Sequence, residues 1–206
     1  MKIVIAIEGM DGSGKSSMAR LTEELCARYD QRFTRIGRRT GYINPAVTKL
    51  THVLGRESAN LTPQADLFIR LAREHQRAHL ASTVPSGVVL LDRFVLSVLA
   101  LVRINNQEVD LITQHLKEIA LRADLHATVF VDCPFEVAWA RVMDRSGGLA
   151  TATERGERLM RRMADYMQED YHRGLLTGQQ WTVNNAKTLD EAGEQLADYL
   201  LPYFRD

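Results

Sequence analysis

The chain alternates short apolar runs with longer stretches in which apolar residues recur at helical spacing. The short runs have strand length and predict strands at 3–7, 32–37, 87–92, 127–132 and 181–185. The longer stretches predict helices at 16–29, 45–55, 63–83, 109–123, 134–145, 157–174 and 188–204. No internal repeat or low-complexity linker interrupts this alternation.

Strands that alternate with helices favour right-handed crossovers and therefore a mostly parallel sheet. The predicted strands are almost uniformly apolar, which suits a sheet that helices cover on both faces. The expected fold is thus a three-layer α/β fold with a five-stranded, mostly parallel sheet. Ligands of such sheets bind beyond the carboxyl ends of the strands, so Glu8, Asp92 and Asp132, which each end a predicted strand, should face one crevice.

Length and composition limit the classes of protein to consider. With 206 residues, 45% of them hydrophobic, the chain can fill one core, and we expect a single domain over 1–206. Lys and Arg equal Asp and Glu at 26 each, so no net field favours nucleic acid or an anionic membrane. Cys26 and Cys133 form no CxxC pair, and no apolar run is long enough for a signal peptide or a membrane span. These features predict a cytoplasmic protein.

The segment GMDGSGKS, at 9–16, fulfils the phosphate-binding pattern GxxxxGK(S/T). It follows a predicted strand and precedes a predicted helix, which is the order that this loop requires. Glycines let successive backbone N–H groups face phosphate oxygens, and the helix N-terminus adds partial positive charge. Lys15 is placed to bridge the β- and γ-phosphates, and Ser16 to ligate Mg²⁺. The motif predicts a site for a nucleoside triphosphate.

Asp92 and Arg93 follow the third apolar strand directly. Asp92 is placed to hold Mg²⁺, directly or through water, and Arg93 to neutralise phosphoryl charge. An aspartate that caps a helix beside a solvated arginine is the structural alternative. The phosphate-binding loop favours the first interpretation.

The segment IEGMDGSGKSS and the Asp-Arg-Phe sequence at 92–94 resemble the thymidylate kinase family, whose members join an EGxDGxGKST loop to a DR(Y/H/F) motif. The segment RADLHATVFVDCPFEVAWARVMDR, at 122–145, is similar to the form PDLTxxLDVxPEVALxRxxxR in that family. The C-terminal VNNAKTLDEAGEQL resembles the last strand and helix of the family. The resemblance spans most of the chain.

The resemblance implies an ATP-dependent phosphotransferase that moves the γ-phosphoryl group to a nucleoside monophosphate, with dTMP as the default acceptor, and a homodimer. It places a mobile lid at about 142–157, with Arg141 and Arg145 closing over the transferring group. Asp11 would lie near the acceptor or its metal, and Arg93 would clamp the attacked phosphate. The expected ATP-binding residues are Gly9, Met10, Asp11, Gly12, Ser13, Gly14, Lys15, Ser16, Ser17 and Arg141. Charged residues of the lid, Arg155, Arg158, Arg161 and Arg162, fit ligand contact and a solvated helix face equally well.

The acceptor pocket departs from the family pattern. The family's REPGG is replaced by GRRTGYINP, so Arg38 or Arg39 is expected to bind phosphate, and Phe68 precedes Arg73 by five residues where the family has four. Ser97 is retained, but Leu101 and Val102 replace the polar residues that read the base, which should relax discrimination. Tyr166 completes the expected acceptor contacts, although Phe68 and Tyr166 fit ordinary core packing as well.

Glu8 separates two functional alternatives. A hydroxyl acceptor, on a nucleoside or a specialised metabolite, needs a general base such as Glu8, whereas a phosphate acceptor carries its own nucleophilic oxygen. A non-catalytic nucleotide-binding module is a third alternative, although Lys15, Ser16, Asp92 and Arg93 are all present. A GTPase switch is disfavoured because no NKxD segment occurs. His75 and His79, spaced i and i+4, are interpreted as helix surface or core because no third metal ligand accompanies them.

Overall fold

The computed structural model describes residues 1–53, 62–105, 109–145, 156–174, 178–186 and 188–204. Its centre is a five-stranded sheet with the order β2-β3-β1-β4-β5, in which every pair of neighbouring strands is parallel. The strands are β1 Lys2–Glu8, β2 Phe33–Ile36, β3 Gly87–Asp92, β4 Leu125–Asp132 and β5 Gln179–Asn184. The predicted α/β fold is confirmed, and the sheet is wholly rather than mostly parallel.

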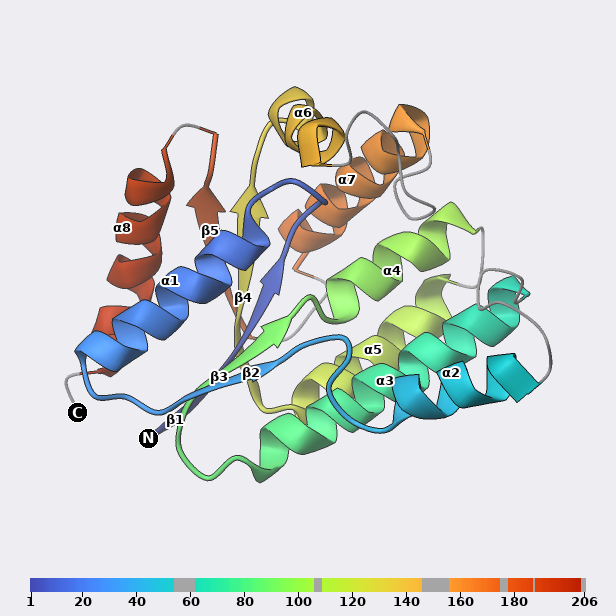
Figure 1. Ribbon diagram of the computed structural model, residues 1–206, viewed down its shortest axis with the longest axis horizontal. Coiled ribbons are helices and arrows are strands. Elements are labelled where there is room, and N and C mark those ends of the chain that lie inside the picture. The colour runs from blue at the N-terminus through green and yellow to red at the C-terminus, as the bar shows by residue number, and fades with distance from the viewer. Residues whose placement is uncertain (54–61, 106–108, 146–155, 175–177, 187, 205–206) are drawn as a thin grey trace.

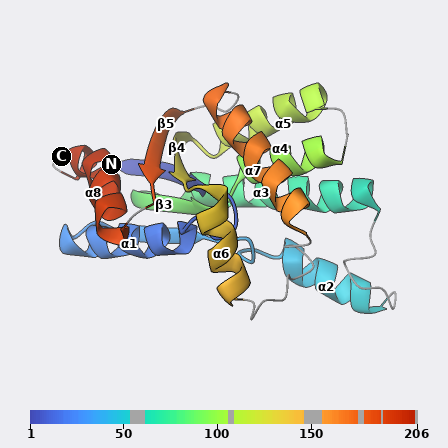
Figure 2. The same cartoon turned by 90° about the horizontal axis from the view of Figure 1, so that it is seen from above.

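The helices of the described residues form the two outer layers (Figures 1 and 2). Their bounds are α1 Lys15–Arg28, α2 Ile43–Val53, α3 Pro63–Thr83, α4 Val95–Ile104, α5 Val109–Arg122, α6 Phe135–Arg145, α7 Glu157–His172, α8 Leu189–Leu200 and a 3₁₀ turn, η2, at Leu201–Tyr203. Two of them, α3 and α8, begin with threonine caps: Thr62 Oγ1 accepts from the backbone N–H of Ala65, and Thr188 Oγ1 from that of Glu191. These caps satisfy backbone donors that the first turn of a helix leaves without partners.

Strand β1 divides the core into its two halves. Ile3, Ile5 and Ile7 pack with α1 and α8 on one face of the sheet, while Val4 and Ala6 pack with α3, α4 and α5 on the other. This division follows from the period of two in a strand, since successive side chains point to opposite faces. Burial on both faces explains why the strands lack a polar side in the sequence.

Helix α4 was not among the predicted helices. The residues that it buries lie all round its surface rather than on one stripe, so the sequence carries no helical period there. They are Val95, Leu96, Ser97, Val98, Leu99, Ala100 and Val102. The helix packs against helices α5 and α7, which lie on either side of it in Figure 1.

Most of the expected lid lies outside the described residues, because 146–155 are not among them. Its mobility therefore stays a prediction. In the part of the chain that the structure describes, no helix combines the length and the apolar character that crossing a bilayer requires.

Candidate active site

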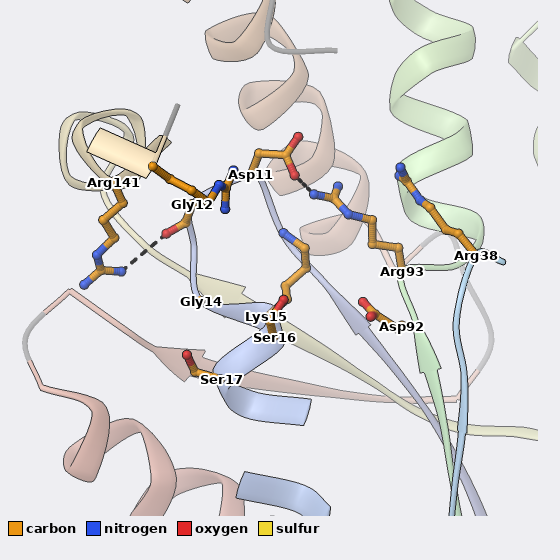
Figure 3. A pocket seen from close by; sticks show the side chains of 11 residues that line it. Asp11, Gly12, Gly14, Lys15, Ser16, Ser17, Arg38, Asp92, Arg93 and Arg141 are labelled. Atoms are coloured by element: carbon orange, nitrogen blue, oxygen red, sulfur yellow. Dashed lines mark hydrogen bonds and ion pairs between the residues drawn. The ribbon is translucent and has the colours of Figure 1, made fainter. Parts of the chain in front are cut away.

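A cavity of about 390 Å³ opens at the carboxyl ends of β1 and β3 (Figure 3). The phosphate-binding loop forms one side of it, and residues that follow β2, β3 and β4 form the rest. Its lining residues are Asp11, Gly12, Gly14, Lys15, Ser16, Ser17, Arg38, Asp92, Arg93, Arg141 and Arg145. With five cationic and two acidic side chains around it, the cavity suits a polyanionic ligand.

The phosphate-binding loop joins β1 to α1 as the sequence predicts. Gly12 and Gly14 adopt positive φ angles of 82° and 99°, which favour glycine. A Cβ atom on Gly12 would collide with the carbonyl of Ala138 in α6. Met10 and Ser13 are buried and are not among the residues that line the cavity.

Lys15 is 6% exposed, and its ammonium donates to the carbonyl of Met10 within the same loop. Burial lowers its pKa to about 7, although the carboxylates of Glu8 and Asp92 oppose this shift. A phosphate group in the cavity would supply the negative charge that favours the ammonium form. Lys15 contacts the loop and lines the cavity, so its position suits phosphate binding.

Arg93 and Asp11 form an ion pair across the cavity (Figure 3). Arg93 has a left-handed backbone with φ of 56°, and its N–H donates to the carbonyl of Ile7 at 2.9 Å. Burial lowers the pKa of its guanidinium. Non-glycine residues hold this backbone at a cost, and such strain is concentrated at functional sites.

Asp92 accepts a hydrogen bond from Arg35, a residue of β2 that the sequence reasoning did not single out. Arg35 is opposite Leu90 in the parallel register of β2 and β3, and this register brings its long side chain to the end of β3. Asp92 lines the cavity, as do Ser16 and Asp11, so hydroxyl and carboxylate oxygens are present among its lining side chains. Oxygen ligands of this kind fit Mg²⁺.

The sequence left open whether Glu8 acts as a general base, and the structure shows which groups its carboxylate contacts. Its side chain is fully buried, and Oε1 accepts from the backbone N–H groups of Phe94 at 2.8 Å, Leu96 at 2.9 Å and Ser97 at 3.3 Å. Its Oε2 accepts from the Ser97 hydroxyl at 2.5 Å. Glu8 therefore caps the N-terminus of α4, where Phe94 has no side-chain oxygen to do so. Ser97, expected to contact the acceptor, serves the same cap.

The expected acceptor residues do not all come together. Arg38 lines the cavity, whereas its neighbour Arg39 is exposed. Phe68 is 74% exposed and does not line the cavity, so the geometry gives no support to a stacking role.

Two further expected acceptor residues contact other side chains of the protein. Tyr166 lies beneath Arg103, whose guanidinium is 4.1 Å from the ring centroid. Arg73 is half-buried with its Nε 3.5 Å from Glu74, and burial lowers its pKa.

A buried ion pair supports this part of the site. Arg77 is fully buried and donates to Glu74 at 2.6 Å, to the carbonyl of Ile36 at 2.8 Å and to that of Asp92 at 3.1 Å. It thereby ties α3 to the ends of β2 and β3. Burial raises the pKa of Glu74, against the pull of Arg77 and Arg73. This role could not be predicted from the sequence, because the two carbonyls that Arg77 binds are far from it along the chain.

The arginines of α6 and α7 divide into two groups. Arg141 and Arg145 line the cavity, and Arg141 is 3.4 Å from the carbonyl of Gly12.

The arginines of α7 make other contacts. Arg161 donates to Glu136 at 3.1 Å and to Glu157 at 3.0 Å, and it covers the ring of Phe135. Among the other lid arginines, Arg162 donates to the Tyr166 hydroxyl, Arg158 is exposed, and Arg155 lies outside the described residues. The geometry favours the solvated-face interpretation for Arg161.

His75 contacts His115 of α5, with the two Nε2 atoms 2.9 Å apart, rather than His79. The described residues contain no group of three or more His, Cys, Asp or Glu side chains that could hold a metal ion. The two histidines instead link α3 to α5.

Comparison with known proteins identifies the family to which the chain belongs. The family model for thymidylate kinase matches residues 7–193. The chain belongs to the thymidylate kinase family. Its members are nucleoside monophosphate kinases that use ATP, which agrees with the phosphate-binding loop and with the cationic cavity.

Sequence identity to two curated members of the thymidylate kinase family shows how distant this relationship is. The thymidylate kinase of Geobacter sp. (strain M21) is 28% identical over 159 residues, which are 75% of this chain and 70% of the relative. That of Xanthomonas campestris pv. campestris (strain B100) is 32% identical over 99 residues, or 48% of this chain and 43% of the relative. The chain is thus a distant family member.

Proposed function

We propose that the protein transfers the γ-phosphoryl group of ATP to the phosphate of a nucleoside monophosphate, and that dTMP is its acceptor. One observation carries the choice of a phosphate acceptor over a hydroxyl acceptor. Glu8 is fully buried, does not line the cavity and accepts hydrogen bonds on both carboxylate oxygens from the N-terminus of α4, so it is not placed to take a proton from a hydroxyl in the cavity. A phosphate monoester needs no such base, because it already carries a nucleophilic oxygen.

Catalysis in this proposal consists of positioning and charge neutralisation. The backbone of the loop and Lys15 hold the phosphates of ATP, while Arg38 and Arg93 hold the acceptor phosphate from the opposite side of the cavity. Arg93 exchanges Asp11 for the acceptor phosphate when the acceptor binds. Arg141 and Arg145 neutralise charge on the transferring group. The attacking oxygen displaces ADP at the γ-phosphorus, so the acceptor gains one phosphoryl group and ATP loses one.

A divalent cation belongs to this proposal. Ser16 and Asp92 are the residues proposed to hold Mg²⁺, and their oxygens suit that ion. Bound Mg²⁺ would neutralise phosphate charge and fix the β- and γ-oxygens. Arg35 donates to one oxygen of Asp92, Oδ2, so an ion bound through Oδ1 would share this carboxylate with Arg35.

We also propose a cytoplasmic homodimer. Free, buried Cys26 and Cys133 agree with a reducing compartment. Large apolar side chains stand exposed on three neighbouring helices: Leu50 on α2, Phe68 on α3 and Leu111 on α5. Covering such side chains is a common reason for association. Light scattering at micromolar concentration tests the expected dimer mass against that of the monomer.

The proposed activity is tested by an ADP-release assay with ATP and Mg²⁺. The acceptors are dTMP, dUMP, other nucleoside monophosphates and unphosphorylated nucleosides, with the mass of each product measured. We expect dTMP to be converted to dTDP, and Lys15→Ala enzyme to give the background rate. Turnover of nucleosides without turnover of any monophosphate would overturn the proposal. Turnover of another monophosphate but not dTMP would overturn only the choice of base.

A further inference from the structure

Asn185 connects three segments that surround the nucleotide site. It follows β5 directly and is 4% exposed. Its backbone N–H donates to the carbonyl of Asp132 at the end of β4, at 2.8 Å. Its side-chain Nδ2 donates to the carbonyl of Ser13 in the phosphate-binding loop at 2.6 Å. The last strand of the sheet is thereby joined to a loop 172 residues earlier in the chain.

Gly14 makes this contact possible. A Cβ atom on Gly14 would collide with Nδ2 of Asn185. The amide of Asn185 therefore occupies the space that a side chain at position 14 would need. The phosphate-binding loop is thus packed from two sides, by α6 at Gly12 and by Asn185 at Gly14.

The contact also fixes a peptide orientation. The carbonyl of Ser13 and the N–H of Gly14 belong to one planar trans peptide, so they point in opposite directions. Because Asn185 holds the carbonyl, the Gly14 N–H is turned away from Asn185, and Gly14 itself lines the cavity. Rotation of this peptide would present a carbonyl oxygen to the phosphates, where the loop needs an N–H donor.

Asn185 contacts a cavity arginine as well. Its backbone carbonyl lies 3.4 Å from both terminal nitrogens of Arg141. The same guanidinium is 3.4 Å from the carbonyl of Gly12. One residue thus contacts the loop through its side chain and Arg141 through its main chain.

We propose that Asn185 is a positioning residue of the nucleotide site, which holds the Ser13–Gly14 peptide in its phosphate-binding orientation. The inference rests on the proposed use of ATP but not on the identity of the acceptor. Asn185 itself does not line the cavity and does not touch the reacting atoms. Its effect should therefore appear in nucleotide affinity, through a loop that is less well ordered before ATP binds.

Two variants separate the hydrogen bond from packing. Asn185→Ala removes the side chain, and Asn185→Leu keeps a similar volume without a donor. Asn184→Ala is the matched control, because Asn184 is adjacent and exposed, and its Oδ1 accepts a hydrogen bond from the backbone N–H of Ala186. The measurements are direct binding of a non-hydrolysable ATP analogue, KM for ATP and for the acceptor, kcat, and the unfolding temperature without ligand.

We expect both Asn185 variants to weaken nucleotide binding and raise KM for ATP about tenfold, which is the effect of one lost buried hydrogen bond. KM for the acceptor should stay within about twofold, and Asn184→Ala should resemble the unmodified enzyme. Unchanged nucleotide affinity in either Asn185 variant would overturn the proposal. An equal loss of ATP and acceptor affinity that follows a lowered unfolding temperature would overturn it too, since that is general destabilisation. Failure of the proposed activity is distinguishable, because it would leave the nucleotide-binding measurement intact and abolish dTMP turnover in the unmodified enzyme.

Discussion

The guanidinium of Arg93 is paired with the carboxylate of Asp11. Each of these side chains lines the cavity, and each comes from a different segment, one after β3 and one from the phosphate-binding loop. The pair neutralises a buried cation that would otherwise face the cavity alone. An acceptor phosphate that takes the place of Asp11 would meet an arginine already held in position.

Replacing Arg93 should abolish turnover without unfolding the chain. Arg93→Ala is expected to lower kcat about 10²- to 10³-fold, the range for loss of one preorganised donor to the transition state. Arg20→Ala is the control, because Arg20 forms an exposed ion pair with Glu24 on the outer surface of α1. Steady-state kinetics and far-UV circular dichroism check the result. A fall of less than tenfold would remove Arg93 from the catalytic set.

The lowered pKa of Lys15 should make the free energy of unfolding of the ligand-free protein increase with pH. Burial lowers its pKa from 10.5 to about 7, so between these values the unfolded chain binds a proton that the native chain does not. The free energy of unfolding should therefore rise as pH increases from 7 to 9. Above pH 9 Cys26 acts in the opposite direction, because burial raises its pKa from 9.0 to about 11.

Urea unfolding at pH 7, 8 and 9 tests this dependence. The difference in unfolding free energy between the unmodified protein and Lys15→Met should shift in favour of the unmodified protein across this range. Saturating ATP should remove the shift, since phosphate charge favours the ammonium. Parallel pH profiles for the two proteins would contradict the lowered pKa.

Ser97→Ala should cost stability rather than acceptor affinity. The hydroxyl donates to the buried carboxylate of Glu8, and a hydrogen bond to a charged group contributes about 1.5–3 kcal/mol. Urea unfolding should report a loss of that size, with KM for dTMP changed less than about twofold. Ser82→Ala is a control, because its hydroxyl makes an exposed bond to the carbonyl of His79. A large rise in KM without loss of stability would restore the expected acceptor contact.

Arg38 and Arg39 form a matched pair for the acceptor phosphate. Arg38 lines the cavity, and Arg39 is exposed beside it. Arg38→Ala should raise KM for the acceptor about tenfold or more, because charge-assisted bonds to phosphate are strong. Arg39→Ala should stay within about twofold. The reverse order would assign the phosphate contact to Arg39.

The strands of the sheet could be predicted from the sequence, whereas helix α4 could not. Strand, loop and helix around Lys15 were predicted in the right order because that motif depends on local chain geometry. Helix α4 is buried nearly all round, so its apolar residues show no period. The helix also depends on Glu8, 86 residues before the first N–H that it caps. Both the burial of α4 and its cap by Glu8 depend on residues far away along the chain.

The acceptor side of the site shows a second limit. The sequence placed Phe68 and Arg73 on one helix but could not say how that helix is rotated against the sheet. The structure leaves Phe68 exposed and brings Arg77 inward, where its partners are the carbonyls of Ile36 and Asp92. The partner of His75 is likewise His115, on another helix, and not His79 one turn away. Each of these contacts is set by tertiary packing.

The hydrogen bond between Asn185 and Ser13 can form only late in the synthesis of the chain. Ser13 leaves the ribosome first, and Asn185 follows 172 residues later. At ordinary rates of translation that interval is roughly 9 to 34 s. The phosphate-binding loop therefore exists for many seconds without the side chain that holds its Ser13–Gly14 peptide, so nascent chains should gain their full affinity for ATP only as β5 joins the sheet.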